Sequence, residues 1–150
     1  MNQETAAFLP SALVVNIQEI DDQHAALFSR LAALKELCLD TTDLPLAEAE
    51  ALMNQLREHC ATEERLAGEN GLNFSAHARK HQMMLKSIAK AIDEVHHQKI
   101  DVFGVLRYIE YWFERHIREE DLNLGRDLQQ MSSSLYDPEK PFTLARAAAA

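Results

Sequence analysis

The stretch 59–81, HCATEERLAGENGLNFSAHARKH, contains the end of one helix, a loop and the start of the next helix. HCATE places His59 and Glu63 at positions i and i+4, and HARKH places His77 and His81 at the same spacing. Side chains at this spacing lie on one face of a helix, one turn apart. The letters GENGLNFS between them favour a helix C-cap and a loop. The stretch therefore predicts two helices joined by a short loop, each with two polar side chains on one face.

Helical periodicity continues in both directions from this loop. Apolar residues recur every three or four positions in four segments, which we expect to be helices: 21–38, 46–67, 75–97 and 102–131. Asp21 or Asp22 is available as the N-cap of the first helix, and Pro45 suits the first turn of the second. Because short loops join the segments, the sequence predicts an all-α fold, an up-down-up-down antiparallel four-helix bundle.

The composition agrees with one helical domain and disfavours several kinds of partner. The chain has 150 residues, 47% of them hydrophobic, and a net charge of -9, which argues against binding nucleic acid or an anionic membrane. The opening residues resemble neither a signal peptide nor a membrane span, so we expect a cytoplasmic protein. The bundle covers residues 21–131, with an N-terminal arm at 1–20 and a C-terminal tail at 132–150. Cys38 and Cys60 are too few for a disulfide framework, and we expect buried thiols.

Histidines on the apolar faces are the unusual feature of the sequence. A single buried histidine is usually a hydrogen-bonded core residue, but several of them in one core need polar partners that a bundle interior rarely offers. A shared metal would satisfy them together. Asp121 follows His116 by five residues, about 140° around an ideal helix, so the spacing alone indicates a solvated side chain. His96 and His97 end the third segment, where we expect them to be solvated. The histidines on the apolar faces are His24, His59, His77, His81 and His116.

In chain order these motifs resemble the hemerythrin family, specifically the bacterial hemerythrin-like domains. The matching parts are IDDQH around His24, the HxxxE and HxxxH motifs of 59–81, and WFERHIREED with His116 and Asp121. No single fragment is specific, but seven ligand types in the family's order, over about residues 14 to 121, form a strong pattern. The resemblance implies a non-haem di-iron centre that binds dioxygen reversibly, in an oxygen carrier, store or sensor rather than an enzyme.

The resemblance also implies a role for each ligand. One iron would take His77, His81 and His116, the other would take His24 and His59, and Glu63 and Asp121 would bridge them. Two octahedral irons need about twelve ligand positions, and these groups with a bridging oxide or hydroxide fill about eleven. The remaining position, on the His24/His59 iron, would take dioxygen or a small anion such as azide. Such domains occur alone or fused to signalling modules, so residues 132–150 are a candidate linker to a signalling partner.

Apolar residues near His116 resemble the lining of the family's oxygen pocket. They are Trp112, Phe113 and Ile117, and Phe28 follows His24 by one turn. Such a pocket would admit dioxygen and exclude water, although the same residues also fit a plain core. Phe113 stands where the family often has leucine, and its larger ring would narrow the pocket. Asn16 stands where glycine is common, and asparagine tolerates a left-handed backbone.

Two other functions compete with this interpretation. A ferritin-like di-iron oxidase needs a Glu-x-x-His pair on each of two helices, and here Glu94-x-x-His97 lies at a helix end. A metal-free interaction bundle would leave the core histidines unexplained. Zinc is disfavoured by the excess of ligands, and mixed imidazole and carboxylate ligands suit iron without excluding manganese.

Overall fold

The loop within 59–81 joins two long helices, as the sequence predicts. In the computed structural model, α3 (Leu46–Glu69) ends at this loop and α4 (Ser75–His96) begins after it. Gly71 in the loop has a φ of 68°, a left-handed conformation that costs glycine little because it has no Cβ. The chain can therefore reverse direction within a few residues. The structure describes residues 9–40 and 43–135.

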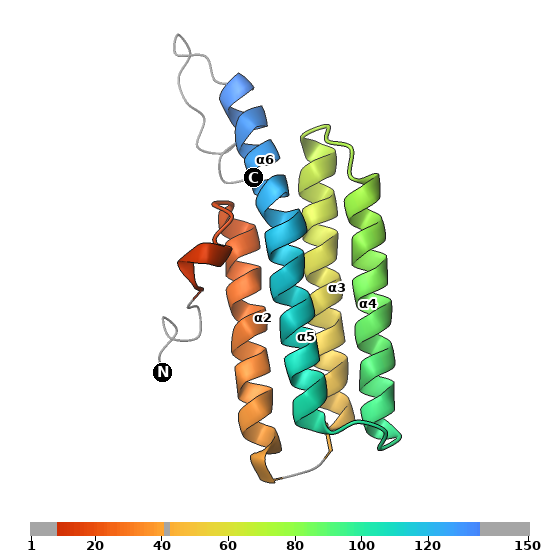
Figure 1. The fold of residues 1–150 in the computed structure, drawn as a ribbon. Coiled ribbons are helices and arrows are strands. Elements are labelled where there is room, and N and C mark those ends of the chain that lie inside the picture. Colours follow the sequence, from red (N-terminus) through yellow and green to blue (C-terminus); the bar gives the residue numbers. More distant parts are fainter. Residues whose placement is uncertain (1–8, 41–42, 136–150) are drawn as a thin grey trace.

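Two further helical rods complete the bundle. The first is α2 (Gln18–Leu37), and the last is α5 (Val102–His116), which continues through a π-helical turn, η3 (Ile117–Asp121), into α6 (Leu122–Leu135). Helices α2 and α4 each pack against both α3 and α5, and neighbouring helices run in opposite directions (Figure 1). Short 3-10 turns, η1 (Ser11–Leu13) and η2 (Cys38–Asp40), lie at the two ends of α2. The prediction of an all-α, antiparallel four-helix bundle is confirmed.

The core is formed by the faces that the periodicity predicts to point inward. Leucines dominate it on α2 and α3, whereas α4 and α5 contribute methionine, isoleucine, valine and phenylalanine. Burying such a side chain stabilises the fold by about 1.5–3 kcal/mol. Both cysteines are buried, as predicted. Among the most buried residues are Leu27, Leu31, Leu52, Leu56, Met84, Ile88, Leu106 and Ile109, each at most 1% exposed.

The first helix begins earlier than predicted, at Gln18 rather than after an Asp21 or Asp22 cap. The Asp21 carboxylate instead accepts hydrogen bonds from the backbone N–H groups of Val15, at 2.8 Å, and Asn16, at 3.0 Å. Asn16 has a φ of 66°, the left-handed conformation expected of an asparagine that replaces glycine here. Asp21 therefore holds the turn that leads into the helix instead of capping its first residue.

The described part of the predicted N-terminal arm that precedes this turn, residues 9–15, packs on the bundle. Leu13 and Val15 are only 2% and 4% exposed. Val15 lies directly over Gly125 of α6, where a Cβ on the glycine would be 2.5 Å from the Val15 carbonyl oxygen. The Gln129 side chain also donates to the Asn16 carbonyl oxygen at 3.3 Å. These contacts hold the segment before α2 against α6 at one end of the bundle.

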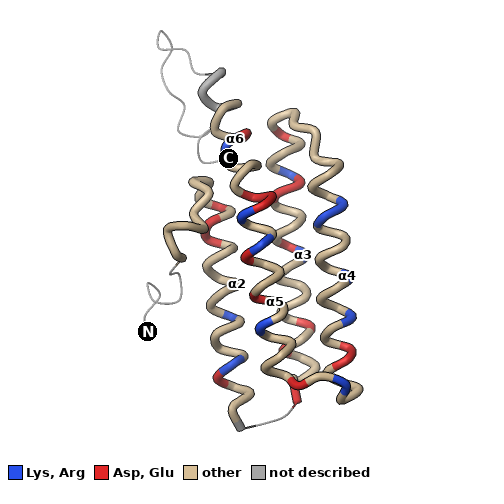
Figure 2. Tube along the Cα trace, viewed as in Figure 1, with Lys and Arg blue, Asp and Glu red and all other residues tan. Residues whose placement is uncertain are grey.

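The outer surface of the bundle carries charges of both signs. Acidic and basic residues are mixed along α2, α3 and α5 (Figure 2). Within the described residues, none of the helices has the length and apolar character needed to cross a membrane. Most of the tail predicted at 132–150, and its role as a linker, lies outside the described residues.

Candidate metal centre

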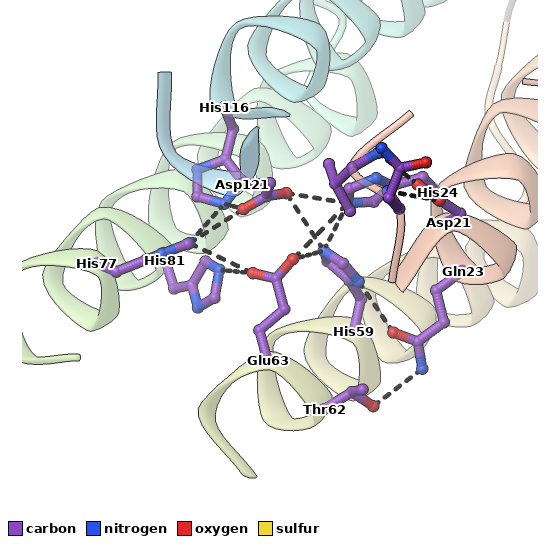
Figure 3. A network of polar contacts seen from close by, with 12 residues as sticks. Asp21, Gln23, His24, His59, Thr62, Glu63, His77, His81, His116 and Asp121 are labelled. Atoms are coloured by element: carbon purple, nitrogen blue, oxygen red, sulfur yellow. Dashed lines mark hydrogen bonds and ion pairs between the residues drawn. The ribbon is translucent and has the colours of Figure 1, made fainter. Parts of the chain in front are cut away.

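The structure brings all seven predicted ligands together in the interior of the bundle, toward the end with the α3–α4 loop (Figure 3). Each helical rod contributes: α2 one histidine, α3 a histidine and Glu63, α4 two histidines, and the fourth rod a histidine and Asp121. The ligands are almost completely buried, with His77 the most exposed at 12% of its side chain. Polar groups in a bundle core need hydrogen bonds, ion pairs or bound metal ions, because burying them without a partner is costly.

Glu63 presents a different oxygen to each half of the cluster. Its Oε1 lies 3.0 Å from His81 Nε2 and 3.3 Å from His77 Nε2. Its Oε2 lies 3.0 Å from His59 Nε2 and 3.7 Å from His24 Nε2. A carboxylate with one oxygen directed to each of two imidazole sets has the geometry of a bridging ligand.

Asp121 repeats this arrangement from the other side of the cluster. Its Oδ1 lies 3.0 Å from His116 Nε2 and 3.1 Å from His77 Nε2. Its Oδ2 lies 2.9 Å from His24 Nε2 and 3.8 Å from His59 Nε2. The donors thus divide into two overlapping groups that share both carboxylates, one with His77, His81 and His116 and one with His24 and His59.

The π-helical turn explains how Asp121 reaches the cluster. On an ideal α-helix a residue five positions after His116 would lie about 140° away from it. Ile117–Asp121 forms a π-helical turn, which takes up one extra residue per turn, so Asp121 points in nearly the same direction as His116. Asp121 is 0% exposed, so the solvated position that its spacing alone indicates is wrong, and 102–131 is not one regular helix.

The contacts between imidazole nitrogens fit shared metal ions. His24 Nε2 lies 3.1 Å from His59 Nε2, and His77 Nε2 lies 3.3 Å from His116 Nε2. Two imidazole nitrogens that bind one ion at a right angle, each at about 2.1 Å, lie about 3 Å apart. The spacing is therefore the one that neighbouring ligands of one ion require.

Unsatisfied polar atoms in the cluster support the same conclusion. Among the described residues, the buried side-chain atoms that make no hydrogen bond are His24 Nδ1, Glu63 Oε2 and both Asp121 carboxylate oxygens. Three of these four atoms are carboxylate oxygens that face the ring nitrogens of the cluster. Most buried polar atoms in proteins have a partner, so metal ions are the simplest completion of this site. The residues present fit a pair of bound metal ions.

Without a metal, charge interactions within the cluster shift the protonation of its members. Burial lowers the pKa of His59, but the negative charges of the nearby Glu63 and Asp121 carboxylates outweigh burial and raise its pKa to about 10. The same balance raises the pKa of His77 to about 9. Burial and the nearby His116 and His77 outweigh Glu63 and lower the pKa of His81.

The two carboxylates stay ionised despite their burial. Burial and Asp121 act to raise the pKa of Glu63, but His59 and His24 hold it well below its usual range. Burial likewise opposes ionisation of Asp121, but His116, His24 and His59 hold its pKa well below its usual range. The metal-free cluster therefore already has the two anionic oxygen ligands that a metal needs.

Aromatic side chains cover the half of the cluster that has fewer histidines. The Phe113 ring lies edge-on to His24 and His59, at centroid distances of 5.2 and 5.8 Å. Phe28 packs behind it at 5.1 Å. Ile117 is 0% exposed, and Trp112 is half-buried against the core. The structure thus places Phe113 in contact with the smaller group of histidines, with Phe28 packed against it.

The remaining histidines lie away from the cluster, at the C-terminal end of α4. The prediction that His96 is solvated is wrong. Its Nε2 donates to the Leu44 carbonyl oxygen at 2.9 Å, and this hydrogen bond joins α4 to the segment before α3. His97 is exposed and donates to the Asp93 carbonyl oxygen at 2.9 Å. The Glu94-x-x-His97 pair, which a ferritin-like site would need in the core, therefore lies at a helix end outside the cluster.

One contact of the cluster was not predicted from the sequence. Gln23, directly before His24, accepts a hydrogen bond from the other ring nitrogen of His59 at 2.9 Å. The position of Gln23 directly before His24 indicates that it lies near the cluster. The sequence does not show which histidine of a neighbouring helix its side chain contacts.

Comparisons with protein-family models, with curated proteins and with solved structures found no match to this chain. The fold and the cluster define the class of protein: an antiparallel four-helix bundle whose buried histidine, glutamate and aspartate side chains could hold metal ions.

Proposed function

We propose that this protein is a hemerythrin-like oxygen-binding protein with a di-iron centre formed by the seven buried ligands. The observation that carries the proposal is the division of the ligands into two groups that share Glu63 and Asp121. A single ion cannot use all seven ligands, whereas two ions bridged by two carboxylates use each of them. Imidazole and carboxylate ligands in octahedral sites suit iron.

The unequal number of histidines in the two groups supports ligand binding on one side. Three histidines and two carboxylates surround one position, and two histidines with the same carboxylates surround the other. A pair of ferrous ions would supply the electrons for reversible binding of dioxygen. The group with His24 and His59 has one protein ligand fewer, so it has room for dioxygen or for an anion such as azide.

Phe113, with Phe28 behind it, gives this side an apolar cover, which we expect the fully buried Ile117 to extend. Phe113 is fully buried and contacts both imidazoles of the smaller group. An apolar environment admits a small neutral molecule and limits access of water and protons, which favours release of the ligand unchanged. A histidine-rich cluster with two carboxylates also differs from the carboxylate-rich sites of di-iron oxidases. We therefore favour a carrier, store or sensor of oxygen over an oxidase.

An optical spectrum of the purified protein tests the proposal. We expect iron-dependent absorption bands in air, loss of the bands on reduction, and their return on exposure to oxygen. Removing the oxygen by vacuum or argon should then reverse the change. Consumption of oxygen with turnover of an added reductant, without a reversible spectrum, would favour the oxidase.

Metal analysis of paired variants tests the ligand assignment. Glu63→Ala removes a bridge and should reduce bound iron from about two per chain to one or fewer. Glu64→Ala is the matched control, because Glu64 is the next residue on α3 and is exposed. Equal iron contents in the two variants would contradict the assignment.

A further inference from the structure

A chain of hydrogen bonds leads from the metal cluster across the α2–α3 interface. His59 directs Nε2 into the cluster, and its Nδ1 lies 2.9 Å from Gln23 Oε1. Gln23 Nε2 in turn donates to Thr62 Oγ1 at 2.9 Å (Figure 3). Gln23 belongs to α2, and both its partners belong to α3, so the amide joins the two helices beside the cluster.

The chemistry of imidazole gives this contact a consequence for metal binding. A neutral imidazole has one protonated and one unprotonated nitrogen, and only the unprotonated nitrogen can bind a metal. An acceptor opposite Nδ1 keeps the proton there and leaves the lone pair of Nε2 directed into the cluster. Gln23 Oε1 is such an acceptor. The Thr62 hydroxyl accepts from the other end of the amide and holds it in this orientation.

The other histidine of the same group has a different environment. His24 Nδ1 is buried and makes no hydrogen bond within the described part of the chain. Within the described ranges, the His24 ring has polar contacts only through Nε2, which lies 2.9 Å from Asp121 Oδ2, whereas the His59 ring is also held by a hydrogen bond at Nδ1. The group with two histidines therefore depends on Gln23 for the orientation of one of its two imidazoles.

We propose that Gln23, held by Thr62, is a positioning residue that fixes the ring and the tautomer of His59 for metal binding. This inference rests on the proposed metal centre. The amide is neutral, so it orients His59 without adding a negative charge to a cluster that already contains Glu63 and Asp121. Its effect should be confined to the ion bound by His24 and His59.

Titration of the metal-free protein with Co²⁺, followed by visible absorption, tests the inference. Gln23→Leu removes the acceptor and keeps the size of the side chain, and Gln23→Glu keeps an acceptor. Gln55→Leu is the matched control, because Gln55 is another half-buried glutamine at the α2–α3 interface, where it accepts from Arg30. Melting curves of the metal-free variants measure any effect on folding separately.

We expect Gln23→Leu to weaken the binding of one of the two Co²⁺ ions by about 10–100-fold, the usual effect of removing such a partner. Gln55→Leu should bind both ions with affinities near that of the wild type. Gln23→Glu, which keeps an acceptor but adds a negative charge that makes His59 more basic, should bind the same ion at least as tightly as the wild type. Thr62→Val should weaken the same ion by a smaller factor, and Thr62→Ser should restore it. In the Co²⁺-loaded protein, the Nδ1 proton of His59 should exchange with water faster in Gln23→Leu.

Two results would overturn the inference. Unchanged Co²⁺ binding by Gln23→Leu would show that packing alone orients His59, and an equal loss in Gln55→Leu would show a general effect of the helix interface. Wild-type protein that binds no Co²⁺ and no iron would refute the metal centre itself. Failure of the positioning role and failure of the proposed function are therefore distinguishable.

Discussion

At the scale of single residues, the two carboxylates make one cluster out of two sets of histidines. Glu63 and Asp121 each direct one oxygen to His24 and His59 and the other oxygen to the remaining histidines. Replacement of either carboxylate removes a ligand from both groups at once. The carboxylates are therefore more sensitive positions than any one histidine.

The protonation of His59 and His77 predicts opposite pH trends for metal-free stability and metal binding. Their pKa values are raised from 6.5 to about 10 and about 9, so the stability they contribute is complete below pH 6.5. This stability is lost as the pH rises through 9 and 10. Metal binding must displace these protons, so affinity should increase over the same range.

Calorimetry in buffers of different ionisation enthalpy measures the protons released on binding Co²⁺. We expect net proton release at pH 7 and less release above pH 10. Chemical denaturation of the metal-free protein should show the matching decrease in stability as the pH rises. Binding at pH 7 without proton release would contradict the raised pKa values.

We predict that Phe113, whose ring contacts His24 and His59, limits the size of the proposed ligand pocket. Phe113→Leu should speed azide binding to the oxidised centre, and Phe113→Ala should also speed oxidation of the oxygenated protein by admitting water. The alanine variant should lose about 3–5 kcal/mol of stability, the usual effect at a fully buried position. Stopped-flow absorption measures both rates.

The iron content of both Phe113 variants should remain that of the wild type. Phe103→Leu, which changes a half-buried aromatic residue of α5 outside the cluster, is the control for changes in helix packing. Unaltered azide and oxygen rates with a lowered Tm would show that Phe113 only packs.

At the scale of elements, the π-helical turn allows Asp121, five residues after His116, to face the cluster while the helix continues along the bundle. The turn rotates Asp121 toward the cluster and carries the chain on into α6. The residues before α2 then pack against α6. The position of Asp121 therefore depends on the packing at this end of the molecule.

Gly125 is the position where this packing permits no side chain. A Cβ would lie 2.5 Å from the backbone oxygen of Val15, so Gly125→Ala must displace the N-terminal segment or α6. We expect a loss of about 1–3 kcal/mol of stability, as for other overpacked positions. Gly68→Ala is the control, because a Cβ there meets nothing within 4 Å.

Gly68→Ala should raise the stability by up to about 0.5–1 kcal/mol, the usual gain of alanine over glycine in a helix. Urea denaturation of the metal-free protein measures both changes. A Gly125→Ala variant as stable as Gly68→Ala would show that Val15 and α6 do not pack in solution as they do in the structure.

At the scale of the whole molecule, the candidate metal centre lies between all four helical rods, and metal binding there should stabilise the bundle. Binding to the folded state alone at 100 times the Kd adds about 2.7 kcal/mol, which corresponds to a rise in Tm on the order of 10 °C. This stabilisation would come from the buried Glu63 and Asp121 oxygens and the His24 ring, because these groups include atoms that make no hydrogen bond in the metal-free structure. Calorimetric scans with and without Co²⁺ measure the rise.

Most of this rise should be absent from Glu63→Ala and present in Glu64→Ala. Equal Tm values for the wild type with and without Co²⁺ would show that the ion does not bind the folded state in preference to the unfolded state.

The sequence by itself determined the bundle, because apolar residues at helical spacing allow few other ways of burying four long faces. It also indicated six members of the buried cluster, since charged and imidazole side chains on apolar faces are costly without a common partner. The seventh, Asp121, was a candidate only through the resemblance of the whole pattern of motifs to the hemerythrin family. Contacts within one turn, such as His59 with Glu63, follow from helix geometry and needed no tertiary information.

Only the tertiary structure decided the features that depend on several elements at once. The π-helical turn that directs Asp121 inward is one of them, because helical periodicity in the sequence predicts a regular α-helix through Ile117–Asp121. The contact of Gln23 with His59, and that of His96 with Leu44, depend on how neighbouring helices are rotated against each other. Local periodicity fixes which face of a helix is buried, but the partner of each side chain on that face is set by the packing of the whole bundle.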